Sequence, residues 1–169
     1  MMKKIFLPFL FSLFSIMLIG QDYNIPKDYK FDTKESYSVY EPQVKETITW
    51  LLSTSLGKDA IKRSEANSFL MAWVGGTPNV TIGISSQIVN FIDKNPELLI
   101  PFIAGWTEYS LNDSYSKDQV QGNKAGVEAV VAFYLKNRGY LKKDGNVEKY
   151  AKLIEKGKLE DDIAKRIKK

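Results

Sequence analysis

The chain of 169 residues contains no cysteine and no histidine. Without cysteine it forms no disulfide, so its stability has to come from packing. Without histidine it lacks the commonest general base and zinc ligand, which excludes a serine–histidine–aspartate triad. The alternating carboxylates of a calcium-binding loop are also missing from the sequence. We therefore predict that the protein binds neither a cofactor nor a metal.

Beyond residue 20 the sequence has no apolar run long enough to span a bilayer. Residues 1–20 join Lys3 and Lys4 to an apolar stretch over 5–19, which ends at Gly20. A basic start, a short apolar stretch and a small final residue are typical of a secretory signal peptide. We expect membrane contact only during export, and a mature protein that is periplasmic or extracellular.

Charge is distributed unevenly along the rest of the chain. Residues 21–135 carry 10 Lys and Arg against 14 Asp and Glu, whereas residues 136–169 carry 12 against 6. The densest basic run, KNRGYLKK at 136–143, holds a single aromatic ring, whereas nucleic-acid sites interleave several. We expect no nucleic-acid binding. A weak contact of the basic C-terminal segment with an anionic envelope surface remains an alternative.

Apolar residues recur at helical spacing over most of the chain from residue 42 onward. Capping residues, first-turn prolines and terminal glycines divide this pattern into segments. The expected helices span about 42–57, 59–76, 85–92, 96–109, 124–138, 146–157 and 159–167. The predicted class is all-α, with residues 42–169 forming a single compact domain, an irregular or orthogonal bundle of about six or seven short helices.

The run FLMAWVGGTPNVTIGI over 69–84 is the most apolar part of this domain. FLMAWV has no polar gap, which predicts burial on nearly all sides of its helix. GGTPN follows that helix and lacks the lysine of a phosphate-binding loop, so we interpret it as a turn. We expect Val80, Ile82 and Ile84 to pass through the interior as a short extended segment near 80–84.

Residues 21–41 form a polar segment without sustained helical or strand periodicity, yet rich in aromatic residues. Disordered segments are poor in aromatic residues, so we predict an ordered N-terminal arm whose rings lie on the domain. The alternative is an exposed aromatic surface for a partner. The candidate ligand- or partner-binding residues are Tyr23, Tyr29, Tyr37, Tyr40, Trp106 and Tyr109.

The best case for catalysis is Glu108, which stands beside Trp106 and Tyr109 in GWTEYS. A carboxylic acid among aromatic rings can stay protonated and donate its proton to the glycosidic oxygen of a stacked sugar. Such chemistry needs a second carboxylate, for which Glu65 and Glu128 are candidates. This predicts, as an alternative, a carbohydrate-active cell-wall hydrolase with Glu108 as general acid.

The hypothesis we favour is an exported, non-catalytic helical domain of the bacterial envelope. It would bind an unidentified protein partner or small ligand, because the residue types of common active sites are missing while aromatic residues are plentiful.

The export hypothesis predicts cleavage after Gly20. When the full chain is produced in an exporting bacterium, the protein recovered outside the cytoplasm should begin at Gln21, because the signal peptidase removes the apolar segment. Intact-mass spectrometry measures this directly. Recovery of the uncleaved chain in the membrane fraction would contradict it.

Overall fold

The computed structural model describes residues 23–168; the predicted signal peptide lies outside this range. Within it the chain forms helices connected by loops, and no residue is in a strand. The elements are α1 (Lys34–Val39), α2 (Glu41–Ser53), α3 (Ala60–Gly76), the 3₁₀ turn η1 (Pro96–Leu98), α4 (Leu99–Asn112), α5 (Gln119–Lys136), α6 (Gly145–Glu155) and α7 (Leu159–Ile167). The predicted all-α class is confirmed.

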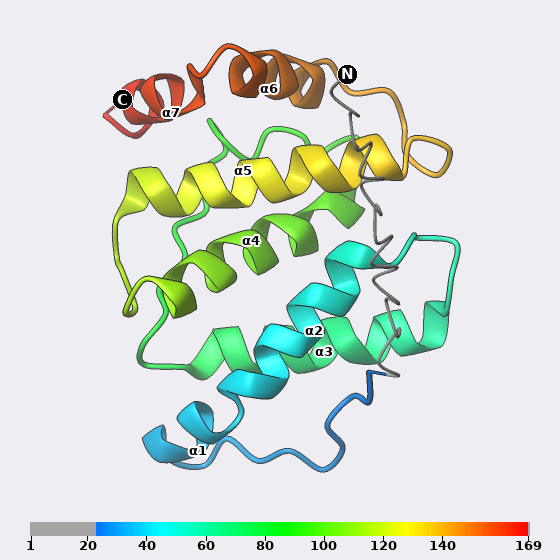
Figure 1. The fold of residues 1–169 in the computed structure, drawn as a ribbon, viewed down its shortest axis with the longest axis vertical. Coiled ribbons are helices and arrows are strands. Elements are labelled where there is room, and N and C mark those ends of the chain that lie inside the picture. The colour runs from blue at the N-terminus through cyan, green and yellow to red at the C-terminus, as the bar shows by residue number, and fades with distance from the viewer. Residues whose placement is uncertain (1–22, 169) are drawn as a thin grey trace, which may run out of the picture.

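Helices α4 and α5 lie side by side across the middle of the molecule (Figure 1). Helices α6 and α7 cover one side of this pair, and α2 and α3 cover the other, with α1 at the far end (Figure 1). Two hydrophobic clusters fill the spaces between these layers. Phe102 and Trp106 of α4 belong to the cluster with α6 and α7, whereas Ala104 belongs to the cluster with α2 and α3.

The contact between α4 and α5 is made through glycine. A Cβ atom at Gly122 would lie 2.2 Å from Cε2 of Trp106, and one at Gly126 would lie 2.7 Å from Cδ2 of Phe102. On α4, a Cβ at Gly105 would lie 2.6 Å from the Cβ of Ala129. These distances are far below van der Waals contact, so only glycine allows the two backbones to approach this closely.

The predicted start of the fifth helix at residue 124 is wrong. Helix α5 begins at Gln119, where the Asp118 carboxylate caps it by accepting hydrogen bonds from the backbone of Val120 and Gln121 at 2.8 and 3.0 Å. The predicted start at residue 124 left Gly122 outside the helix. Gly122 lies within the continuous helix α5, and its lack of a side chain leaves room for the Trp106 ring beside it.

The predicted helix at 85–92 is also wrong, because this segment forms turns. In a helix its carbonyl groups would accept hydrogen bonds from backbone N–H groups four residues later. Here side chains of α6 and α7 occupy three of those carbonyls. The side chains of Arg166, Tyr150 and Asn146 donate hydrogen bonds to these carbonyl oxygens. The acceptors are Gln87, Ile88 and Asn90, in that order, at 2.8, 2.8 and 2.9 Å.

Two expectations about burial in the apolar run are corrected. In α3, Phe69 and Trp73 are fully buried, whereas Met71 is 40% exposed, so the helix is buried on one side. Val80 is buried as expected, but Ile84 is 55% exposed, so the segment after α3 reaches the surface. An apolar run without polar gaps therefore does not require burial on every face.

The glycine contact predicts a specific cost for added volume. Gly122→Ala should destabilise the protein by about 2 kcal/mol or more, because the new methyl group overlaps the buried Trp106 ring. Gly75→Ala is the matched control in a helix, since a Cβ there has no atom within 4 Å. This control should gain about 0.5–1 kcal/mol from helix propensity. Urea unfolding measures both, and equal effects would contradict the proposed role.

Candidate functional site

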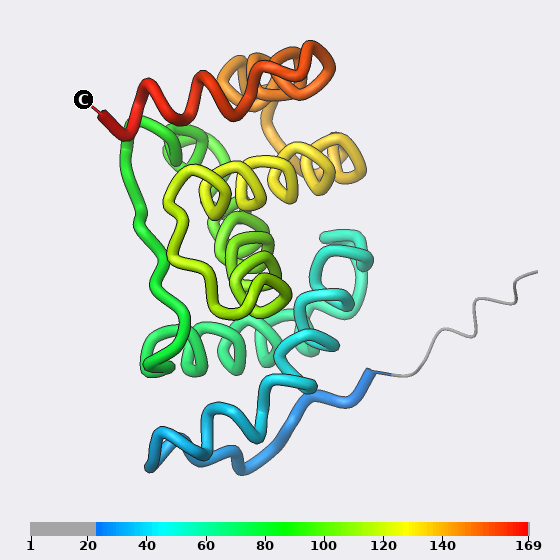
Figure 2. The backbone as a smooth tube through the Cα atoms, turned by 60° about the vertical axis from the view of Figure 1, so that its left-hand side comes forward, coloured from blue at the N-terminus to red at the C-terminus, as the bar shows by residue number. Residues whose placement is uncertain are grey.

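The aromatic arm packs along α2 and α3, at the opposite end of the molecule from α6 and α7 (Figure 2). Its rings form a connected group: Phe31 stacks on Tyr37 with centroids 4.9 Å apart, and Tyr29 meets the buried Phe69 edge-on at 5.1 Å. The backbone carbonyl of Tyr37 accepts a hydrogen bond from the Trp73 indole at 2.9 Å. The arm is therefore part of the second hydrophobic cluster.

Within the arm, residues 34–39 form helix α1, which the sequence analysis did not predict. Thr33 and Ser36 hold its first turn through reciprocal hydrogen bonds between side chain and backbone, at 3.3 Å each. The capping signal was present in the sequence, but the helix is six residues long and buries no residue, so no apolar periodicity accompanied it.

Tyr23 anchors the beginning of the described chain. Its side chain is 8% exposed, and its hydroxyl lies 2.6 Å from Oγ1 of Thr47 on α2. Since the Thr47 hydroxyl donates its only proton to the carbonyl of Gln43, Tyr23 is the donor in this contact. Burial raises the pKa of the Tyr23 phenol above its ordinary value.

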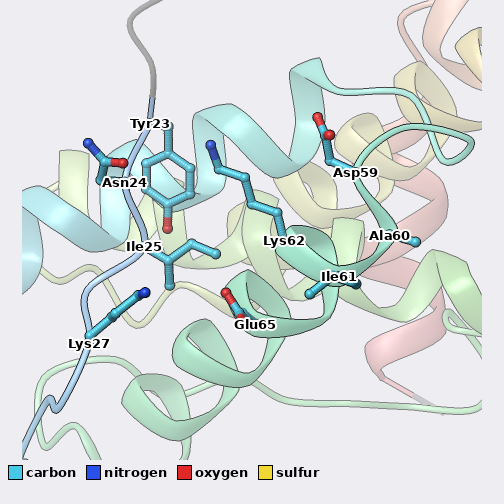
Figure 3. A pocket seen from close by; sticks show the side chains of 9 residues that line it. All are labelled: Tyr23, Asn24, Ile25, Lys27, Asp59, Ala60, Ile61, Lys62 and Glu65. Atoms are coloured by element: carbon cyan, nitrogen blue, oxygen red, sulfur yellow. The ribbon is translucent and has the colours of Figure 1, made fainter.

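Beside Tyr23 lies a hollow of about 990 Å³, which we call the arm groove. It lies between the start of the arm and the first two turns of α3 (Figure 3). Nine residues line it: Tyr23, Asn24, Ile25, Lys27, Asp59, Ala60, Ile61, Lys62 and Glu65.

The arm groove combines charges of both signs with apolar side chains. Lys27 comes from the arm and Glu65 from α3, and they face the hollow from opposite walls (Figure 3). The Lys62 ammonium lies 5.6 Å from the centre of the Tyr23 ring, a cation–π distance. Ile61 is 79% exposed, the largest exposure among the large apolar side chains in the described range.

Asp59 has an unusual conformation at the edge of this groove. Its φ is 48°, in the left-handed region that, apart from glycine, mainly asparagine and aspartate adopt. It precedes α3, yet its side chain makes no capping hydrogen bond to that helix. Asp59 therefore lines the groove without capping α3.

The catalytic candidates separate into two places. Glu65 lines the arm groove, whereas Glu108 lines a different hollow of about 530 Å³ between α4 and α5. Glu128 shares that second hollow and forms an ion pair with Lys124 at 3.1 Å. The structure therefore brings Glu108 together with Glu128 and not with Glu65.

Of the two aromatic neighbours of Glu108, only Tyr109 lines that hollow. Trp106 is fully buried and meets Phe102 edge-on at 5.8 Å in the core. Tyr109 lines the hollow, but its hydroxyl contacts Asp113 and Ser116 at 3.0 and 2.9 Å.

Two of the residues named from sequence, Tyr23 and Glu65, meet in the arm groove. Sequence reasoning missed Lys27, Ile61 and Lys62, because nothing in the sequence indicates that the arm lies against α3. The one available signal in the sequence was an isoleucine close to charged residues, Ile61 in DAIKR.

Among residues 23–168, no three or more acidic side chains are placed to hold a metal ion, and no helix has the length and apolar character to cross a membrane. Searches against protein-family models, curated proteins and solved structures find no significant match to this chain.

Tyr23→Phe tests how the arm is held. The variant should lose about 1 kcal/mol of stability at neutral pH, because one buried hydrogen bond is removed. The raised pKa of Tyr23 adds a pH dependence: its stabilising effect is present below about pH 10 and is lost as the pH rises through the folded-state pKa.

Denaturant unfolding of both proteins between about pH 8 and 11 measures this difference. Tyr150, whose pKa burial raises to about 12, is unchanged in both and so cancels from the comparison. A gap in stability that is the same at every pH would show that Tyr23 ionises as freely in the folded protein as in the unfolded chain.

Proposed function

We propose that the protein is an exported, non-catalytic helical domain that binds an extended segment of a partner polypeptide in the arm groove. The observation that carries this proposal is the lining of the groove, which joins the exposed Ile61 to charged side chains of both signs. Export is supported by the basic and apolar character of residues 1–20.

A polypeptide suits the groove better than a small molecule does. Small-molecule sites enclose most of the surface of their ligand, whereas Ile61 stands 79% exposed on an open wall of this groove. An extended chain can place an apolar side chain against Ile61 and Ile25. Its acidic side chains would suit Lys27, and its basic side chains would suit Asp59 or Glu65.

The arm makes this site rigid before the partner arrives. Tyr23 is fixed to α2 by its hydroxyl, and the backbone of Tyr37 is fixed to Trp73 of α3. A wall that is already ordered lowers the entropy cost of binding. The hydrolase alternative has less support, because Trp106 is buried and Glu65 lies outside the hollow of Glu108.

The experiment uses peptides selected against the full chain from a random-peptide phage library. Ile61→Asp should weaken their binding at least about tenfold, because a charge replaces the apolar contact of the groove. Ile84→Asp is the matched control, since Ile84 is also an exposed isoleucine but does not line the groove. Isothermal titration calorimetry gives both affinities.

Circular dichroism should show the same helix content for both variants, because both side chains are largely exposed. Two outcomes would contradict the proposal. One is that no selected peptide binds at the groove. The other is that Ile61→Asp and Ile84→Asp bind the peptides equally well.

A further inference from the structure

We infer that a second surface, separate from the arm groove, docks on an anionic lipid bilayer. We call it the basic edge and define it as the residues Lys58, Lys136, Arg138, Tyr140, Lys142 and Lys143. Lys58 belongs to the loop between α2 and α3, and the others belong to the end of α5 and the loop that follows it. The two loops lie on the same side of the molecule in both views (Figures 1 and 2).

Most of the positive charge of the basic edge lies in residues 136–143, which contain Lys136, Arg138, Lys142 and Lys143. No acidic residue occurs between Lys136 and Lys143. The next acid, Asp144, is fully buried, and its carboxylate caps α6 by accepting the backbone N–H of Asn146 at 2.8 Å. The carboxylate that follows residues 136–143 is thus withdrawn from the surface, and the exposed acid next to the basic edge is Asp59, which follows Lys58.

Buried side chains hold this surface in one conformation. Asn95, 1% exposed, accepts the backbone N–H of Lys142 at 2.8 Å and donates to its carbonyl at 3.1 Å. Asn137, fully buried, accepts the backbone N–H of Leu56 at 2.9 Å and so joins the two loops. The backbone that carries the basic side chains is therefore already ordered, so binding here does not include the entropy cost of ordering it.

Tyr140 completes the junction between the loops. Its ring lies against Gly57, where a Cβ would come within 2.3 Å of the tyrosine hydroxyl. The side chain is nevertheless 65% exposed, so it lies on the surface among the basic residues. Leu135, in the last turn of α5, is 44% exposed beside this segment.

This combination favours a lipid headgroup region over other polyanions. Tyrosine places its apolar ring in the interface and its hydroxyl in water, and lysine and arginine reach the anionic headgroups around it. Single-stranded nucleic acid is held by several aromatic rings that stack on successive bases, and the basic edge has one.

The test compares binding of the full chain to phosphatidylcholine vesicles with and without phosphatidylglycerol, by co-sedimentation at low salt. Each basic residue near an anionic surface contributes about a fivefold change in binding. Lys142→Glu with Lys143→Glu should therefore lower the binding that depends on phosphatidylglycerol by at least about 20-fold. Added salt of about 0.5 M should lower it as well.

The matched control is Lys30→Glu with Lys34→Glu, which changes the net charge equally at two exposed positions of the arm. Lys3, Lys4 and the apolar stretch 5–19 are the same in all variants, so their contribution cancels. Ile61→Ser changes the arm groove without adding a charge near Lys58, and it should leave vesicle binding unchanged, which distinguishes this surface from the arm groove.

A third variant, Tyr140→Ala, distinguishes a bilayer from a soluble polyanion. It should weaken vesicle binding and leave any binding to inorganic polyphosphate unchanged. Absence of vesicle binding at low salt, equal losses from the two double variants, or Tyr140→Ala without effect on vesicles would each overturn the inference. Circular dichroism checks that every variant is folded.

Discussion

The close approach of α4 and α5 is the contact on which the other parts of the structure depend. Glycines at 105, 122 and 126 leave room for the Trp106 and Phe102 rings against the facing backbone. With this pair joined, α4 presents Trp106 to one hydrophobic cluster and Ala104 to the other. Helices α6 and α7 then pack on one side and α2 and α3 on the opposite side. Larger side chains in place of the glycines would force α4 and α5 apart.

Buried polar side chains connect segments that are far apart in the sequence. Tyr150 bonds to the turn at Ile88, Asn95 to the backbone of Lys142, and Tyr23 to Thr47. Each of these side chains is at least nine-tenths buried and hydrogen-bonded, so removing one partner would leave the other unsatisfied. They fix the loops and the arm, and both proposed binding surfaces lie on those loops and on that arm.

The two surfaces differ in what they could bind. The arm groove mixes both signs of charge with exposed isoleucine, which suits a polypeptide segment. The basic edge carries one sign of charge around an exposed tyrosine, which suits an anionic interface. Together the two proposals describe an exported domain whose basic edge holds it at a membrane while its arm groove receives a partner.

Local signals in the sequence determined the helical class and most of the helices. Apolar spacing and caps located α2, α3, α4, α6 and α7, because these signals act within a few residues of the chain. Tertiary contacts decided the rest. Gly122 lies inside α5, where its missing side chain makes room for the Trp106 ring. The carbonyls of the segment 85–92 accept hydrogen bonds from side chains of α6 and α7 where a helix had been predicted. The arm groove depended on where the arm lies, since Tyr23 and Glu65 are brought together by packing, which no local pattern encodes.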